Sequence, residues 1–108
     1  MKNLFSVEGK TVLVTGGSRG IGLMIARGYV ENGAIVYISS RKAEVCDAEA
    51  VALSKYGEGH SLPADISTMD GIEKLAAAFA ERENKLNILV NNAGAAWGAP
   101  IDDFPEQG

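Results

Sequence analysis

A glycine-rich segment at residues 15–22, with the sequence TGGSRGIG, constrains the fold of this chain most strongly. Glycines at positions 16, 20 and 22 allow the backbone to turn sharply and to approach a ligand closely, because they carry no Cβ. A helix that starts at such a turn directs free amide groups toward an anion such as a phosphate. The spacing TGxxxGxG differs from GxGxxG, and the segment lacks the Lys and Ser or Thr that a P-loop requires. Taken alone, the pattern fits either a phosphate-binding turn or a tight strand-to-helix connection.

Apolar runs and amphipathic segments alternate along the rest of the chain. The pattern predicts strands at 11–14, 34–38, 60–64 and 88–90 and helices at 21–32, 43–55 and 69–79. Strands separated by helices of this length form βαβ units, in which a parallel sheet is covered by helices on both faces. The sequence therefore predicts an α/β fold of the Rossmann type, with a doubly wound parallel sheet.

Two local signals predict how the helices begin and which side they bury. Ser67, with Asp70 three residues later, has the spacing of a capping box and predicts the start of the third helix. Helical spacing also predicts that the first helix turns one set of residues toward the sheet. These residues are Ile21, Met24, Ile25, Gly28 and Tyr29.

Four segments follow directly after the predicted strands: the glycine turn and residues 39–41, 65–66 and 91–94. The carboxyl ends of parallel strands meet at one edge of a sheet, where ligands bind if the strand order reverses. All four segments should therefore open on the same edge. This convergence favours the phosphate-binding interpretation of the glycine turn.

The segment after the second strand discriminates between dinucleotides. NAD sites usually carry an acidic residue about 20 positions past the glycines, which binds the ribose 2′-hydroxyl. This chain has Ser40 and Arg41 instead. Arg41 and Arg19 can flank a 2′-phosphate to which Ser40 donates a hydrogen bond, which predicts NADP(H) as the cofactor. The alternative is that Arg41 and Lys42 are solvated charges at a helix start, although cations there oppose the helix dipole.

Three motifs together resemble the short-chain dehydrogenase/reductase family. They are TGxxxGxG after the first strand, Asp65 with an apolar neighbour after the third, and NNAG after the fourth. The resemblance covers essentially the whole chain. The exact sequence TGGSRGIG, with the later NNAG, Trp97 and Gly98, is most similar to the 3-oxoacyl reductases, including the rhamnolipid-type β-ketoacyl reductases.

The resemblance implies a role for each motif. The glycine turn would hold the pyrophosphate and adenosine ribose, Asp65 and Ile66 the adenine, and Asn91 and Asn92 the centre of the sheet. From the residues alone, Asp65 can equally be a turn residue, and both asparagines can satisfy loop backbone groups. The cofactor-binding residues implied by the family are Gly16, Gly17, Ser18, Arg19, Gly20, Ile21, Gly22, Ser40, Arg41, Asp65, Ile66, Asn92, Ala93 and Gly94.

The family's chemistry uses a serine and a Tyr-x-x-x-Lys pair to move a proton. None of the three tyrosines, Tyr29, Tyr37 and Tyr56, has a lysine four residues later. No catalytic residue and no metal ligand is therefore predicted in this chain. We expect residues 1–108 to form the cofactor-binding half of an oxidoreductase, a domain incomplete at its C-terminal end.

Composition limits the partners. The net charge of −4 and the absence of a basic stripe argue against nucleic acid, and no apolar run has the length of a membrane span or a signal peptide. We expect a cytoplasmic chain. The resemblance implies an NADPH-dependent enzyme that reduces a small-molecule ketone to an alcohol, with a 3-oxoacyl thioester as a candidate, and that is a homo-oligomer when full length. The alternative is a non-catalytic nucleotide-binding or interaction module made of this half alone.

Overall fold

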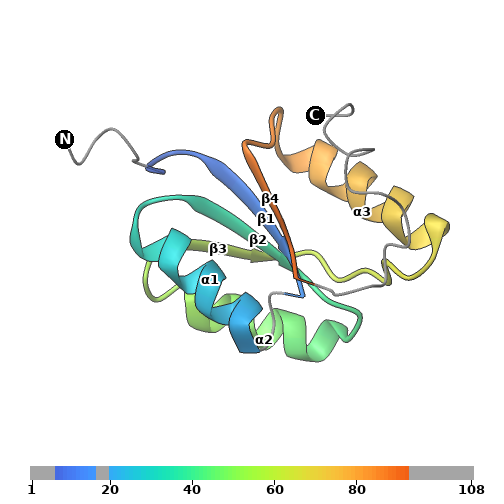
Figure 1. The fold of residues 1–108 in the computed structure, drawn as a ribbon, viewed down its shortest axis with the longest axis horizontal. Helices are drawn as coiled ribbons and strands as arrows, with labels where there is room; N and C mark the ends of the chain where they lie inside the picture. The colour runs from blue at the N-terminus through green and yellow to red at the C-terminus, as the bar shows by residue number, and fades with distance from the viewer. Residues whose placement is uncertain (1–6, 17–19, 93–108) are drawn as a thin grey trace.

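The computed structural model describes residues 7–16 and 20–92. They form one sheet of four parallel strands in the order β3-β2-β1-β4 (Figure 1). In chain order the elements are β1 (Thr11–Thr15), α1 (Gly20–Glu31), β2 (Ile35–Ser39), α2 (Ala43–Leu53), β3 (Glu58–Ser61), α3 (Met69–Arg82) and β4 (Ile88–Asn91). The predicted α/β doubly wound sheet is confirmed.

The chain builds the sheet outward from β1 in one direction and then returns to place β4 on the other side of β1. Helices α1 and α2 cover one face, and α3 lies on the opposite face (Figure 1). The strand order therefore reverses between β1 and β4, which is where ligands of such sheets bind. Among the described residues, no helix is long and apolar enough to span a bilayer.

Each face of the sheet has its own hydrophobic core. Val14 of β1 and Ile38 of β2 pack on the face of α1 and α2, while Leu13 and Tyr37 pack on the face of α3. All five residues of β1 are buried, because the strand is central and covered on both faces. Such a strand appears in the sequence as a continuous apolar run rather than an alternating one.

Helix α1 buries a different side from the predicted one. Gly22, Ala26 and Val30 are its buried residues, whereas Ile21 and Met24 are 68% and 73% exposed. The prediction was wrong for Ile21 and Met24, although Tyr29 of the predicted set does pack against the core. The side facing the sheet is selected by the need for close approach. Glycine and alanine allow the helix to lie near the backbone of the strands, which bulkier side chains would prevent.

Strand β3 begins two residues earlier and ends three residues earlier than the predicted range. After Ser61 the chain still follows β2, since Leu62 N donates to Ile38 O (2.9 Å) and Ala64 N to Ser40 O (3.0 Å). The predicted range of 60–64 thus covers a segment that keeps bonding to β2 beyond the regular strand. Pro63, which lacks an N–H, is tolerated there because β3 is an edge strand.

Helix α3 starts at Met69 as predicted, but its N-cap differs by one residue. Thr68 is the N-cap, and its Oγ1 accepts a hydrogen bond from Gly71 N at 3.0 Å. The prediction that Ser67 caps this helix was therefore wrong. Ser67 instead donates to Asp65, as described below.

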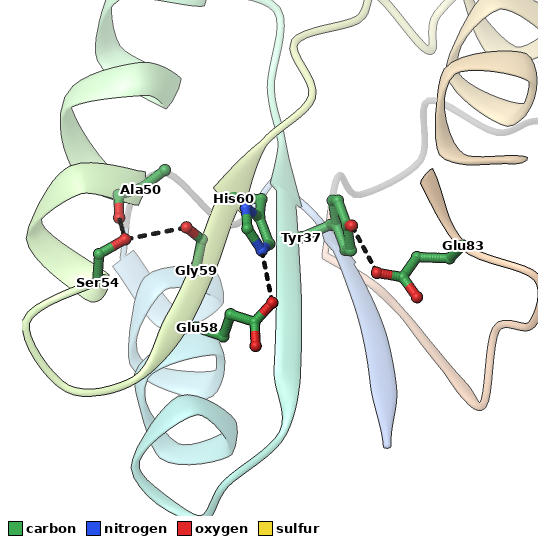
Figure 2. Close-up of polar contacts among 7 residues, drawn as sticks. All are labelled: Tyr37, Ala50, Ser54, Glu58, Gly59, His60 and Glu83. Atoms are coloured by element: carbon green, nitrogen blue, oxygen red, sulfur yellow. Dashed lines mark hydrogen bonds and ion pairs between the residues drawn. The ribbon is translucent and has the colours of Figure 1, made fainter. Parts of the chain in front are cut away.

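The carboxyl end of α3 is attached to the sheet through Tyr37. Figure 2 shows its hydroxyl pointing to the Glu83 carboxylate, to which it donates at 2.7 Å. The same ring meets Phe79 edge to face and lies beside His60 of the edge strand. Burial, followed by the hydrogen bond to Glu83, raises the pKa of Tyr37 to about 12. The neutral phenol is therefore part of the folded structure at ordinary pH.

Candidate functional site

A cleft of about 830 Å³ opens at the carboxyl edge of the sheet. It receives the turn after β1, the segments after β2 and β3, and the end of β4. Its lining residues are Gly16, Gly20, Ile21, Ser39, Ser40, Arg41, Lys42, Val45, Ala64, Asp65, Ile66, Ser67 and Asn92. The convergence expected from the sequence is thus present, and the cleft lies at the reversal of strand order.

The turn between β1 and α1 depends on glycine for two separate reasons. Gly16 and Gly20 have φ values of 71° and 58°, a region that residues with a Cβ rarely adopt. Gly22 lies behind the cleft, where a Cβ would overlap Gly16 O and come within 2.7 Å of Asn92 Nδ2. The backbone of Gly16 is fixed in turn by a hydrogen bond from its N–H to Ser39 O at 2.7 Å.

Thr15 joins the ends of β1 and β4. Its hydroxyl lies 3.0 Å from Asn91 Oδ1 and 3.3 Å from Val90 O. Asn92 N donates to Thr15 O at 3.1 Å, which fixes the backbone of Asn92 at the cleft. The side chain of Asn91 and the backbone of Asn92 thus both bond to Thr15; that the two asparagines hold the sheet centre stays a prediction. The role of Thr15 was not predicted, although a hydroxyl residue directly after the apolar run of β1 is a visible signal.

The segment after β2 is the cationic part of the cleft. Ser40 is partly exposed, and Arg41 and Lys42 are exposed at the start of α2. Lys42 is the N-cap of that helix and makes no side-chain cap hydrogen bond. Ser39 is 1% exposed, and its Oγ has no hydrogen-bond partner within residues 7–16 and 20–92. Ser39 and Lys42 were not predicted as site residues, although they flank Ser40 and Arg41 at the same strand end.

The segment after β3 supplies an acid. Asp65 Oδ1 accepts hydrogen bonds from the N–H and the Oγ of Ser67, at 3.0 and 2.5 Å. These bonds, and then the nearby charge of Arg41, lower the pKa of Asp65 below its usual value. Asp65 is therefore both a helix-entry residue and a cleft residue. Ile66 is 9% exposed and belongs to the core under α3 as well as to the cleft.

The remaining predicted residues fall into two groups. Gly22 supports the cleft from behind and is not among its lining residues. Five others lie outside the residues that the structure describes: Gly17, Ser18, Arg19, Ala93 and Gly94.

The cleft has the properties of a nucleotide site. It offers a glycine turn at a helix start, two cations beside each other at Arg41 and Lys42, and one ionised carboxylate at Asp65. None of the three tyrosines of the chain lines it. The described surface can therefore hold an elongated ligand with several anionic groups, and it contains no tyrosine placed for proton transfer.

Sequence comparisons agree with this geometry. A family model described as short chain dehydrogenase matches residues 10–108. The "Rhamnolipids biosynthesis 3-oxoacyl-(acyl-carrier-protein) reductase" of Pseudomonas aeruginosa is 50% identical over 108 residues, covering all of this chain and 42% of the relative. The 3-oxoacyl-(acyl-carrier-protein) reductase FabG of Chlamydia pneumoniae is 44% identical over 90 residues, covering 82% of this chain and 36% of the relative.

Solved structures show the same relationship. The Pseudomonas aeruginosa RhlG/NADP active-site complex has a TM-score of 0.82 at 51% identity, covering 85% of this chain and 37% of that one. L-sorbose reductase from Gluconobacter frateurii, complexed with NADPH and L-sorbose, has a TM-score of 0.79 at 32% identity and covers 82% and 35%. The chain thus spans less than half the length of these relatives. The family model and the identity over the whole chain show that this protein belongs to the short-chain dehydrogenase family of oxidoreductases.

Proposed function

We propose that residues 1–108 form the NADP(H)-binding half of a short-chain reductase that converts a ketone to an alcohol. The observation that carries the proposal is the meeting of the glycine turn, the Arg41 and Lys42 pair and the Asp65 turn in one cleft. Similarity to a 3-oxoacyl-(acyl-carrier-protein) reductase and to a structure solved with NADP supports it. A 3-oxoacyl thioester is the candidate substrate.

The residues present fit a dinucleotide. Gly16 and Gly20 line the cleft in left-handed conformations without side chains, so that a pyrophosphate can approach the start of α1. In the proposed assignment, Gly17, Ser18, Gly20 and Ile21 complete this cradle. The buried hydroxyl of Ser39, unpartnered in the described part of the chain, marks the neighbouring wall as polar.

Each wall of the cleft would bind a different part of the dinucleotide. Arg41 and Ser40 would both donate hydrogen bonds to the 2′-phosphate, those from Arg41 being charge-assisted. Arg19 would add a second guanidinium. Asp65 and Ile66 would contact the adenine. Asn92, Ala93 and Gly94 would line the nicotinamide side, where Thr15 fixes the backbone of Asn92. NADPH supplies the hydride for the reduction.

The proton that completes the alcohol is not assigned to any residue of this chain, because the sequence contains no Tyr-x-x-x-Lys pair. The proposal therefore concerns the cofactor half of the reaction, within a homo-oligomeric enzyme. Catalysis would be tested by loss of NADPH absorbance when a 3-oxoacyl thioester is added to a protein that contains this domain. Dinucleotide binding without such turnover would favour the non-catalytic module instead.

The direct test is a pair of dissociation constants for NADPH and NADH, measured by calorimetry at one ionic strength. Two charge-assisted contacts to the 2′-phosphate should give NADPH a preference of about a hundredfold. Replacing Ser40→Asp together with Arg41→Ala should shift the preference toward NADH, because the new carboxylate repels the phosphate and accepts from the ribose. Arg82→Ala removes a guanidinium at the far end of α3 and is the matched control. Equal affinities for both cofactors in the unmodified protein would overturn the assignment.

A further inference from the structure

The carboxylate of Asp65 is held by one of its two oxygens. Oδ1 accepts both hydrogen bonds from Ser67, whereas Oδ2 has no hydrogen bond to any residue that the structure describes. Asp65 lines the cleft and is partly buried. An ionised carboxylate only accepts hydrogen bonds. The turn thus leaves Asp65 with one acceptor oxygen available to a ligand.

Two different sets of contacts hold this residue. The carbonyl of Asp65 is bound by Thr68, whose Oγ1 and N lie 3.3 and 3.5 Å from it, and Gly71 lies against the same carbonyl. These contacts fix the backbone of the turn at the start of α3. Among the described residues, only Ser67 bonds to the carboxylate itself. The orientation of the side chain therefore depends on Ser67, and the course of the backbone on Thr68 and Gly71.

A single ionised acceptor discriminates between bases. It attracts an N–H group and repels a carbonyl oxygen placed at the same point. Adenine carries an exocyclic amino group where hypoxanthine carries a carbonyl. A carboxylate held in one orientation should select a 6-aminopurine, whereas one that rotates freely can turn away from the carbonyl.

We infer that Ser67 is a positioning residue that orients Asp65 so that the cleft accepts a 6-aminopurine dinucleotide and rejects a 6-oxopurine one. The inference rests on the proposed function, since it places the base of the dinucleotide beside Asp65. It adds a residue that neither the motifs nor the comparisons assign. Its physical basis is the pair of hydrogen bonds that converge on Oδ1.

The experiment compares the affinities of NADPH and its hypoxanthine analogue, deamino-NADPH, by calorimetry. The unmodified protein should prefer NADPH by about tenfold, a modest ratio because Asp65 is only partly buried. Ser67→Ala removes the hydroxyl and should reduce the ratio to about threefold or less, because the carboxylate is no longer held toward the amino group and can turn away from the carbonyl. Ser67→Thr keeps the hydroxyl and should restore the ratio.

Thr68→Ala is the matched control. It removes a neighbouring hydroxyl that bonds only to backbone groups of the turn, so it should lower the thermal stability but leave the ratio unchanged. An unchanged ratio in Ser67→Ala would overturn the inference, as would an equal loss of the ratio in Thr68→Ala. If the unmodified protein binds both dinucleotides equally, the inference fails while the proposed function stands. If it binds neither, the proposed function fails and the inference with it.

Discussion

The turns that lead into α1 and α3 share a geometry but differ in how their amide groups are satisfied. In both, the third residue of the helix is a glycine packed against the carbonyl oxygen six positions earlier: Gly22 on Gly16, and Gly71 on Asp65. In the second turn, the hydroxyl of Thr68 accepts from Gly71 N. In the first, no side chain of the described residues accepts from the opening amides of α1.

This difference indicates which helix start can receive an anion. The amino end of α3 already has an acceptor from its own chain, and an acid precedes it. The amino end of α1 faces the cleft through Gly20 and Ile21, with a conformation that only the absence of side chains makes possible. A turn capped by hydroxyl groups thus positions side chains, whereas a turn made of glycine leaves its amides to a ligand.

The largest effect is expected when a side chain is added at Gly22, the glycine packed against the turn that leads into α1. Gly22→Ala should destabilise the fold by about 3 kcal/mol, since the added Cβ overlaps Gly16 O and contacts Asn92 at the end of another strand. Dinucleotide binding should fall below detection. Urea unfolding and calorimetry would measure both.

Gly28→Ala is the control for that change, because it adds the same methyl group to the same helix at a point with no atom within 4 Å. It should stabilise the protein by about 0.5–1 kcal/mol. A Gly22→Ala variant that behaves like Gly28→Ala would show that α1 does not need its close approach.

Adding a side chain at Gly71, the glycine packed against the turn that leads into α3, should affect stability more than dinucleotide binding. Gly71→Ala places a Cβ onto Asp65 O, an overlap at least as close as that at Gly22, and should also cost about 3 kcal/mol in the free energy of unfolding. The affinity for NADPH should fall less than tenfold, because in the proposed assignment the phosphate groups would contact the other turn. Loss of binding as complete as in Gly22→Ala would remove the distinction between the two turns.

A smaller effect is expected from the cap of α3. Thr68→Ala should lower the free energy of unfolding by about 1 kcal/mol, because Gly71 N loses its acceptor. Thr68→Ser keeps the oxygen and should unfold at nearly the urea concentration of the unmodified protein. Equal stability of the alanine and serine variants would indicate that water replaces the cap.

The smallest effect at neutral pH concerns the other end of α3. Tyr37→Phe removes the hydrogen bond to Glu83 and should cost about 0.5 kcal/mol at pH 7, since Glu83 is partly exposed. The phenol has a pKa of about 12 in the folded chain against an ordinary value of 10.0. Its contribution is therefore fully present below pH 10 and is lost as the pH rises through 12.

Phenylalanine has no such loss, so the difference between the two proteins should close and then reverse over this range of pH. Unfolding curves of both proteins between pH 9 and 12, compared pairwise, would measure the difference. Parallel curves over the whole range would contradict the role given to the Tyr37 hydroxyl.

The sequence was sufficient for the fold class and for the edge of the sheet that carries the cleft. Strand segments such as residues 11–15 are apolar enough to be identified alone, and parallel strands bring their carboxyl ends together wherever they lie in the chain. Asn92 and Asp65 could therefore be placed in one site without any knowledge of distances.

The details that failed depend on contacts between elements. Which side of α1 meets the sheet is decided by how near the helix must lie, so Ala26 is buried and Met24 is exposed against the hydrophobic pattern. The choice between Ser67 and Thr68 as the cap depends on the exact path of the turn, because both residues carry a hydroxyl. Thr15 joins β1 to β4 through a hydrogen bond to Val90, which lies 75 residues later in the chain. Local sequence patterns carry no information about contacts between residues so far apart.

The hydrogen bond from Gly16 N to Ser39 O has a consequence for the thermodynamics of binding. It joins the turn that would hold the pyrophosphate to the strand end that would hold the 2′-phosphate, so their spacing is established when the chain folds. A ligand that bridges the two does not have to bring them together, and less backbone freedom is lost when it arrives. The two phosphate subsites should therefore respond together to any substitution that shifts the end of β2, rather than as independent contacts.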